Sequence, residues 1–234
     1  MNSIELRDFF TDIKYSWEKD RENLEVICKL TKTRVRPEIG EFKFTFGLEQ
    51  PFLIKAISDH IKAKSFFEIG TGRGTACYSV ALGPSVKEIK TVDITPFQQK
   101  MDTAINYRSA CVSNADLYEM IPFEEKEKIM FMHTSQVEDA IANRDNSFDL
   151  CFIDGNHSDP RIIYGDFKVC QKIVKNGGVI LFDDYHPTKF AVREVVHKIL
   201  EENPRYDATL VKFHGHLFDE RNKAPDNGVV IMYV

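Results

Sequence analysis

Hydrophobic positions in the chain change their spacing in a regular way from about residue 47 onward. Short, almost continuous apolar runs are typical of strands buried on both faces, and apolar residues three or four positions apart mark one face of a helix. The two patterns alternate here, which predicts a parallel sheet covered by helices on both sides. The predicted strands lie at 65–69, 88–93, 129–133, 148–154, 179–182, 209–218 and 229–234.

The connections between these strands refine the fold. Helical spacing is absent between the last two strands, so we expect them to be antiparallel to each other. The sequence therefore predicts a doubly wound α/β fold with a mostly parallel seven-stranded sheet over residues 47–234. Thr95-Pro96 would open a helix after the second strand, and the segment 111–128 has no regular pattern. The other predicted helices lie at 51–61, 76–82, 135–142, 159–174 and 189–202.

Residues 1–46 precede the alternating region and are predicted to form an N-terminal helical cap. Apolar residues from Ile4 to Trp17 and from Leu24 to Leu30 have helical spacing, which predicts one or two amphipathic helices. The aromatic segment Phe42–Phe46 would suit a pocket cover, a subunit contact or the core alike. A homo-oligomer formed through this region is one expectation.

The composition narrows the class of partner. The chain has 234 residues, of which 43% are hydrophobic, and its formal net charge is −5 at pH 7. Because phosphate backbones call for a basic surface, this balance argues against nucleic acid and favours a small-molecule partner. The sequence has no apolar run of membrane-spanning length, and its five cysteines include no CxxC pair. We therefore expect a cytoplasmic protein without a membrane partner.

A glycine-rich turn, S-F-F-E-I-G-T-G-R-G-T, runs from the first predicted strand into a helix. Gly70, Gly72 and Gly74 permit positive φ and let a ligand approach the backbone, and the amides at the start of the helix favour anionic groups. Such turns also join strands to helices for steric reasons alone. A dinucleotide fingerprint needs G-x-G-x-x-G, and Thr75 occupies the place of its third glycine. The spacing therefore favours a different adenosine ligand.

Acidic residues stand at the ends of several predicted strands. Glu68 lies at the end of the first strand, Asp93 ends the second, Asp154 ends the fourth, and Asp183 and Asp184 follow the fifth. In an open parallel sheet the ligand crevice lies beyond the carboxyl ends of the strands, so these acids would line it. Asp93 would accept hydrogen bonds from the ribose hydroxyls of an adenosine, and capping a helix is its other interpretation.

These motifs, taken in order, resemble the class I S-adenosylmethionine-dependent methyltransferases. The resemblance rests on E-I-G-T-G-R-G from Glu68 to Gly74, on V-D at Asp93 and on G-G-V-I-L-F-D-D-Y before residue 186. It implies that the glycines face the methionine and ribose, and that Glu68 orders the turn and the methionine ammonium. The implied cofactor contacts are Glu68, Gly70, Thr71, Gly72 and Gly74 in the turn, Asp93 and Asp154 at strand ends, and Ser135 and Gln136 at the adenine edge.

A narrower resemblance is to the cation-dependent O-methyltransferases of the catechol and caffeoyl-CoA types. Their pattern is an aspartate after one strand and Asp-Asn after the next, and here Asp154, Asp183 and Asp184 occupy these places. Asp184 in place of the asparagine is similar to the enzymes that act on antibiotic sugars. Two carboxylates about 4 Å apart repel by roughly 4 kcal/mol at an effective dielectric of 20, so three close together call for a cation, a proton or solvent. Oxygen ligands suit Mg²⁺; aspartates that cap helices and face water are the alternative.

His157 follows Asp154 in the sequence D-G-N-H-S-D-P, on the loop above the same strand end. Some sugar O-methyltransferases place a general base here, and an imidazole with a pKa near 6.5 can accept a hydroxyl proton. The implied reaction methylates a hydroxyl of a small acceptor with adjacent oxygens, a sugar diol or a catechol-like compound, with Asp154 and His157 as catalytic residues. His186 is a second candidate base, and His214 and His216 share a face of a predicted strand without a third ligand nearby.

Two other functions fit parts of the pattern. A nicotinamide-dependent oxidoreductase would use a similar sheet, although Thr75 disfavours it. A non-catalytic protein that binds an adenosine ligand would need the glycine turn and Asp93, and its acidic cluster would then be fortuitous.

Overall fold

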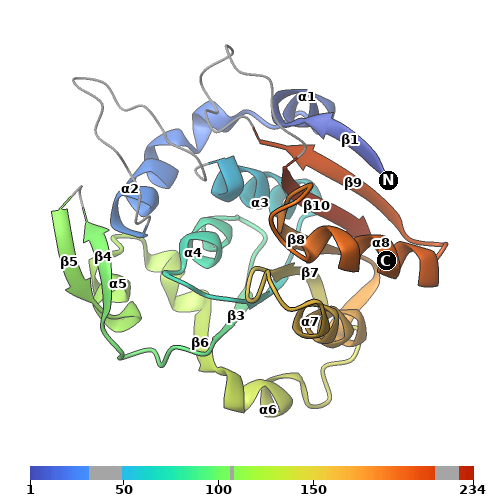
Figure 1. Ribbon diagram of the computed structural model, residues 1–234. Helices are drawn as coiled ribbons and strands as arrows, with labels where there is room; N and C mark the ends of the chain where they lie inside the picture. The colour runs from blue at the N-terminus through green and yellow to red at the C-terminus, as the bar shows by residue number, and fades with distance from the viewer. Residues whose placement is uncertain (32–48, 106–107, 214–226) are drawn as a thin grey trace.

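The computed structural model describes residues 1–31, 49–105, 108–213 and 227–234. These residues form a main sheet of eight strands with helices on both faces (Figure 1). Across the sheet the strands are β1 (Asn2–Glu5), β9 (Asp207–Lys212), β10 (Gly228–Tyr233), β8 (Val174–Tyr185), β7 (Phe148–Ile153), β2 (Ser65–Ile69), β3 (Glu88–Asp93) and β6 (Ile129–His133).

Most neighbouring strands of this sheet are parallel. β6, β3, β2, β7 and β8 run in one direction, and β10 is antiparallel to both of its neighbours, β8 and β9. This confirms the doubly wound, mostly parallel sheet and the antiparallel pair at its C-terminal end. The carboxyl ends of β2, β3, β7 and β8 therefore meet at one edge, which is where a ligand crevice is expected.

Both faces of the sheet are buried because successive side chains of a strand point to opposite sides. Phe66 belongs to a core that includes helices from the first third of the chain, and the adjacent Phe67 belongs to a second core beneath later helices. The helices α1 (Leu6–Asp12), α2 (Arg21–Thr31), α3 (Glu49–His60) and α4 (Thr75–Ala81) contribute to the first core, and α7 (Pro160–Ile173) and α8 (Val192–Glu202) contribute to the second.

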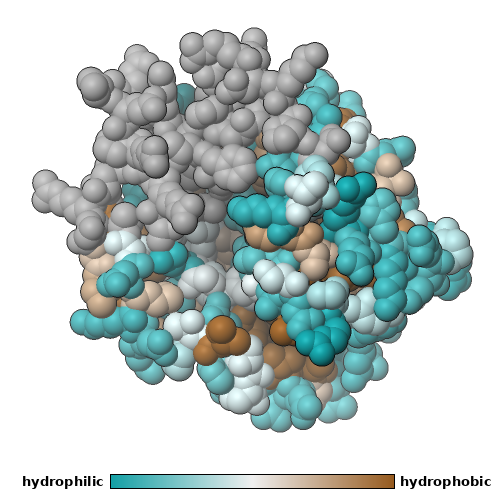
Figure 2. Space-filling view, in the orientation of Figure 1, coloured by the Kyte–Doolittle hydropathy of each residue, from teal (hydrophilic) through white to brown (hydrophobic). Residues whose placement is uncertain are grey.

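Figure 2 shows that the described surface is mainly hydrophilic in this view, with hydrophobic residues in small patches.

No helix of the described residues is both long and apolar enough to cross a membrane.

The described residues also include several smaller elements. The smaller elements are a separate hairpin of β4 (Met101–Ile105) and β5 (Arg108–Val112), the helices α5 (Asn114–Met120) and α6 (Val137–Ile141), and the 3₁₀ turns η1 (Trp17–Lys19), η2 (Glu124–Lys128) and η3 (Thr134–Gln136).

The sheet has one strand more than the seven predicted. β1 forms where the apolar spacing predicts a helix that includes Ile4, and it pairs in parallel with β9 so that Ile4 lies opposite Val211. The helical spacing begins only at Leu6, with Phe9 and Phe10, whereas Ile4 lies two positions before Leu6, which is the spacing of a strand. α1 and α2 confirm that the N-terminal segment contains helices. The domain boundary predicted at residue 46, the segment Phe42–Phe46, His214 and His216 all lie outside the described residues.

The helix predicted after Thr95-Pro96 is wrong. A turn forms instead, in which the Gln99 amide donates to the Pro96 carbonyl at 2.8 Å, and the chain then enters the β4–β5 hairpin. The Thr95 amide donates to Asp93 Oδ1 at 2.7 Å, so the strand-end aspartate closes this turn. The ring of Phe97 packs against the ring of Phe131, with the ring centroids 4.7 Å apart. Tertiary packing of the aromatic side chain therefore overrides a local signal for a helix start.

The segment 111–128, which has no regular pattern in the sequence, is ordered by a capping box. Ser113 Oγ accepts from the Asp116 amide at 3.1 Å, and the Asp116 carboxylate accepts from the Ser113 amide at 2.8 Å. This reciprocal pair starts α5, and S-x-x-D is the sequence signal that would have predicted it.

Candidate active site

A cavity of about 220 Å³ lies at the edge where the carboxyl ends of β2, β7 and β8 meet. Helices from the N-terminal part of the chain close it, because α2 contributes Thr31 and α3 contributes Gln50. A larger hollow of about 530 Å³ runs along α8, but none of the strand-end acids lines it, so we place the site at the smaller cavity. The smaller cavity is lined by Thr31, Gln50, Glu68, Thr71, Gly72, Arg73, Thr75, Ala76, Asp154 and Asp183.

The three glycines of the turn differ in what requires them. Gly70 has φ +97°, and a Cβ there would lie 2.1 Å from the Asp154 carbonyl oxygen, so only glycine lets the two loops touch. Gly74 has φ +79°, and a Cβ there would lie 2.6 Å from the ring of Tyr78. Gly72 faces open space at φ +52°. Protein packing therefore accounts for the first and third glycines, and the middle one faces space that a ligand can occupy.

Asp93 is held against the glycine turn, as expected for a strand-end acid beside it. Its Oδ2 accepts from the Gly72 amide at 2.8 Å, and its Oδ1 accepts from the Thr95 amide. Both bonds fix the carboxylate at the rim of the cavity and leave further lone pairs for a ligand.

Glu68 carries a fully buried carboxyl group at the cavity wall. Its Oε2 accepts from the Thr91 hydroxyl, whose oxygen lies 2.6 Å from the Thr71 hydroxyl. Its Oε1 has no nitrogen or oxygen donor among the described residues, and the Cys77 thiol contacts the same carboxyl group. Burial raises the pKa of Glu68 to about 8 because the charged form loses its hydration. Glu68 therefore keeps its proton to a higher pH than an exposed glutamate does.

Ser135 and Gln136 lie in the η3 turn after β6, beside the end of β3. The pair is positioned by His133, whose Nδ1 accepts from the Ser135 amide at 3.2 Å and whose amide donates to Gln136 Oε1 at 2.9 Å. His133 Nε2 in turn donates to the Ile94 carbonyl at 3.1 Å. This tie between the two loops was not predicted, and Ile94, an apolar residue 77% exposed directly after Asp93, was missed as well.

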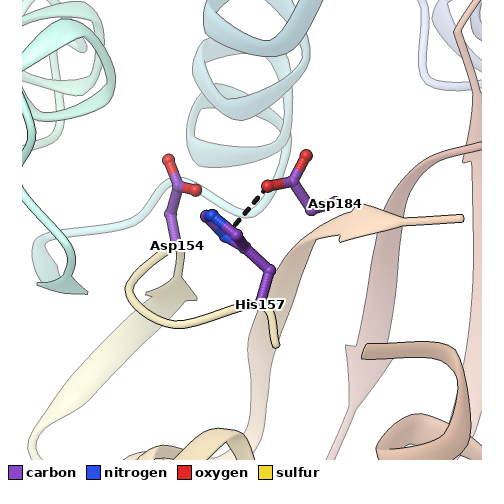
Figure 3. A group of neighbouring side chains, drawn as sticks. All are labelled: Asp154, His157 and Asp184. Carbon is purple, nitrogen blue, oxygen red and sulfur yellow. Dashed lines mark ion pairs between the residues drawn. The ribbon is translucent and has the colours of Figure 1, made fainter. Parts of the chain in front are cut away.

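Asp154, His157 and Asp184 point toward one another above the ends of β7 and β8 (Figure 3). One ligand atom from each residue lies within 4.8 Å of the other two, which is close enough to share a metal ion. His157 Nδ1 lies 3.0 Å from Asp184 Oδ2, and both side chains are partly exposed. The hydrogen bond to Asp184 raises the pKa of His157 above its ordinary value because the carboxylate stabilises the imidazolium.

The structure pairs Asp183 differently from the predicted trio of aspartates. Its carboxylate accepts from Gln50 Nε2, which also donates to Asp154 Oδ2 at 3.4 Å. Asp184 has φ +54°, in the left-handed region, and this turn of the backbone directs its side chain to His157. Asp154 thus shares the Gln50 amide with Asp183 and also lies close to His157 and Asp184. No motif in the sequence marks Gln50.

His186, the second candidate base, is engaged in its own loop. Its Nδ1 accepts from the amides of Thr188 and Lys189 at 3.2 and 3.0 Å. These bonds orient the ring within the loop before α8, and His157 is the histidine that joins the carboxylates.

Sequence comparison decides the family. A family model described as a methyltransferase domain matches residues 67–185, just over half of the 234-residue chain. The chain belongs to this methyltransferase family. The match runs from β2 to the end of β8 and so includes the glycine turn and every strand-end acid discussed above. No curated protein sequence matches the methyltransferase significantly.

Solved structures share the fold of this methyltransferase at low sequence identity. The O-methyltransferase TomG of Streptomyces achromogenes, in complex with S-adenosylmethionine, has a TM-score of 0.60 at 17% identity, over 91% of this chain and 89% of that chain. An O-methyltransferase of Bacillus cereus with S-adenosylhomocysteine has 0.57 at 17%, over 93% and 90%. A Staphylococcus aureus protein provisionally classed as a caffeoyl-CoA O-methyltransferase has 0.52 at 17%, over 97% and 96%. These likenesses show a common fold.

Proposed function

We propose that the protein transfers a methyl group from S-adenosylmethionine to a hydroxyl oxygen of a small acceptor with adjacent oxygens, and that a divalent cation takes part. The observation that carries the proposal is the group of Asp154, His157 and Asp184 beside the cavity of the glycine turn, in a chain of the methyltransferase family. S-adenosylmethionine in the TomG structure and S-adenosylhomocysteine in that of the Bacillus cereus enzyme support the choice of cofactor. A sugar diol or a catechol-like compound is the acceptor class that adjacent oxygens imply.

Residues around the cavity fit this cofactor. Glu68 offers a buried carboxyl oxygen with no nitrogen or oxygen donor in the described part of the chain, which suits the ammonium group of the methionine part. Gly72 leaves open space, and Asp93 at the rim suits the ribose hydroxyls. Ile94 and the η3 turn (Thr134–Gln136) would contact the face and the edge of the adenine. When bound, the cofactor supplies an electrophilic methyl group, and the protein residues hold it in place.

Asp154, Asp183 and Asp184 would hold the cation, and Gln50 donates to Asp154 and Asp183. Carboxylate oxygens suit hard ions such as Mg²⁺, and the imidazole nitrogen of His157 in the same group also admits other first-row divalent metals. The donor set therefore fits a divalent cation, with Mg²⁺ as our prediction. Such an ion would supply Lewis acidity, which lowers the pKa of a hydroxyl group.

His157 would take the proton of the acceptor hydroxyl. A carboxylate only accepts hydrogen bonds, so the 3.0 Å contact fixes the proton of neutral His157 on Nδ1, where it donates to Asp184. Nε2 then carries the lone pair and is the basic atom. Asp184 orients the ring and stabilises the imidazolium that forms, as a carboxylate does for the histidine of a catalytic triad.

Calorimetry with two ligands tests the proposal first. S-adenosylhomocysteine is expected to bind and NAD is not, because Thr75 replaces the third glycine of a dinucleotide site. A methyl-release assay on a panel of sugar diols and catechols then tests for turnover, with and without a chelator and with Mg²⁺ restored. Binding of NAD alone would refute the cofactor assignment. Turnover that the chelator does not change would refute the cation.

Glutamine at position 157 is expected to lower kcat by about 10² to 10⁴-fold, because an amide cannot accept the hydroxyl proton. The affinity for S-adenosylhomocysteine should stay within about twofold, since His157 is not among the residues that line the cavity. Steady-state kinetics and calorimetry measure the two quantities. His60→Gln, at an exposed site in the last turn of α3, is the matched control. A wild-type kcat in His157→Gln would show that another group takes the proton.

A further inference from the structure

The carboxamide of Gln50 lies between two strand-end aspartates. Its Nε2 donates to Asp183 Oδ2 and, at 3.4 Å, to Asp154 Oδ2. Gln50 belongs to the first turn of α3, is 6% exposed and precedes Asp154 by 104 residues. Its amide therefore ties the start of α3 to the ends of β7 and β8.

The chemistry of the contact fixes which end of the amide faces the aspartates. Ionised carboxylates accept hydrogen bonds and cannot donate them, so the NH₂ group, and not the carbonyl oxygen, must point at both. Because one nitrogen contacts both residues, an oxygen of Asp154 and an oxygen of Asp183 lie close together. Hydrogen bonds to charged groups are among the stronger ones in proteins.

A cation that binds Asp154 Oδ2 or Asp183 Oδ2 would use the same oxygen atoms as Gln50. An N–H group and a cation both bind the lone pairs of a carboxylate, so they compete when they bind the same oxygen atom. Binding of a cation to these two Oδ2 atoms would weaken or displace the two hydrogen bonds from Gln50. The protein without a cation is therefore stabilised by Gln50 in a way that the cation-bound protein is not.

We propose that Gln50 sets the cation affinity of the site by competing with the cation for Asp154 and Asp183. The inference rests on the proposed function, because it assumes a cation site that includes Asp154. It adds a residue from α3 that neither the strand-end motifs nor the family match identifies. Gln50 would thus raise the concentration of free divalent ion at which the site becomes occupied.

Mn²⁺ titration of the full chain without acceptor tests this inference. Electron paramagnetic resonance of free Mn²⁺ gives the dissociation constant, and thermal unfolding with and without Mn²⁺ gives Tm. Gln50→Leu is expected to bind Mn²⁺ about tenfold more tightly, since the competing hydrogen bonds are lost. Its Tm without a cation should fall, and Mn²⁺ should raise Tm by more than in the wild type. Gln50→Glu keeps the side-chain shape and adds a ligand oxygen. It should bind Mn²⁺ still more tightly, have a still lower Tm without a cation, and show a larger rise of Tm with Mn²⁺.

A glutamine on the other side of the molecule provides the control. Gln171 of α7 donates to the Tyr206 hydroxyl at 2.8 Å, so Gln171→Leu should lower Tm equally with and without Mn²⁺ and leave the dissociation constant unchanged. If the wild type binds Mn²⁺ and both Gln50 variants bind it with unchanged or weaker affinity, the proposed role of Gln50 is wrong, and the cation of the proposed function is not affected. A wild type that does not bind Mn²⁺ would overturn it together with the cation of the proposed function.

Discussion

Asparagine in place of Asp154 is expected to lower kcat/KM for methyl transfer by about 10³-fold while the fold stays intact. Asp154 joins His157 and Asp184 in one group, lines the cavity and accepts from Gln50, so its charge lies at the centre of the site. The variant keeps the backbone bond from its amide to the Ile69 carbonyl at 2.8 Å. Asparagine has nearly the size and shape of aspartate, so Tm without a cation should stay close to that of the wild type.

The test of this prediction combines kinetics with thermal unfolding. Initial rates are measured over a range of Mg²⁺ concentrations, and unfolding is followed in the presence of a chelator. Asp145→Asn makes the same chemical change at a 61% exposed side chain before the opposite end of β7, and should behave as the wild type. Normal kcat/KM at saturating Mg²⁺ would remove Asp154 from the catalytic residues. A fall in both kcat/KM and cation-free Tm would assign the loss to folding instead.

Glutamine in place of Glu68 is expected to remove a large part of the pH dependence of stability. The pKa of Glu68 is raised from 4.5 to about 8 by burial, so between these values the folded protein holds a proton that the unfolded chain releases. The free energy of unfolding therefore falls as pH rises through this window, by about 1.4 kcal/mol per pH unit for one proton. Above pH 8 both states have lost the proton and this contribution becomes constant. The whole effect is on the order of several kcal/mol.

Urea unfolding at pH 5 and pH 8 measures this effect. Glutamine has the shape of the protonated acid, so wild type and Glu68→Gln should be similar at pH 5, and the variant should be the more stable at pH 8. Other titrating groups are common to both proteins and cancel in the comparison. Glu201→Gln, at an exposed site in α8, should follow the wild type. Equal pH dependence in Glu68→Gln and wild type would mean that Glu68 is ionised throughout.

Local pattern was enough for the elements whose signal lies within a few residues. The apolar runs of β2, β6 and β7 are short and nearly continuous, and the turn between β2 and α4 carries its glycines in the sequence itself. Asp93 and Asp154 follow from the rule that parallel strands end at the ligand edge. The family match then confirmed the methyltransferase identity that the order of these motifs implies.

Elements that depend on distant partners were predicted poorly. The residues after Pro96 form a turn and a hairpin because Phe97 packs on Phe131, and the N-terminal residues form β1 because the edge of β9 accepts them. The same limit applies to side chains in the site. His133 orders the η3 turn from the preceding strand end, and its bond to Ile94 joins two loops that are 39 residues apart in the chain.

The sequence by itself determined the fold class, the glycine turn and the presence of acids at the strand ends, because these features arise from the alternation of strands and helices along the chain. Only the tertiary structure decided how the acids are paired. A single left-handed φ at Asp184 directs it toward His157, and α3 brings Gln50 to Asp183 from more than a hundred residues away. The direction of a side chain at a strand end depends on one backbone angle and on the residues that pack against it. Neither can be predicted from the residues next to it in the sequence.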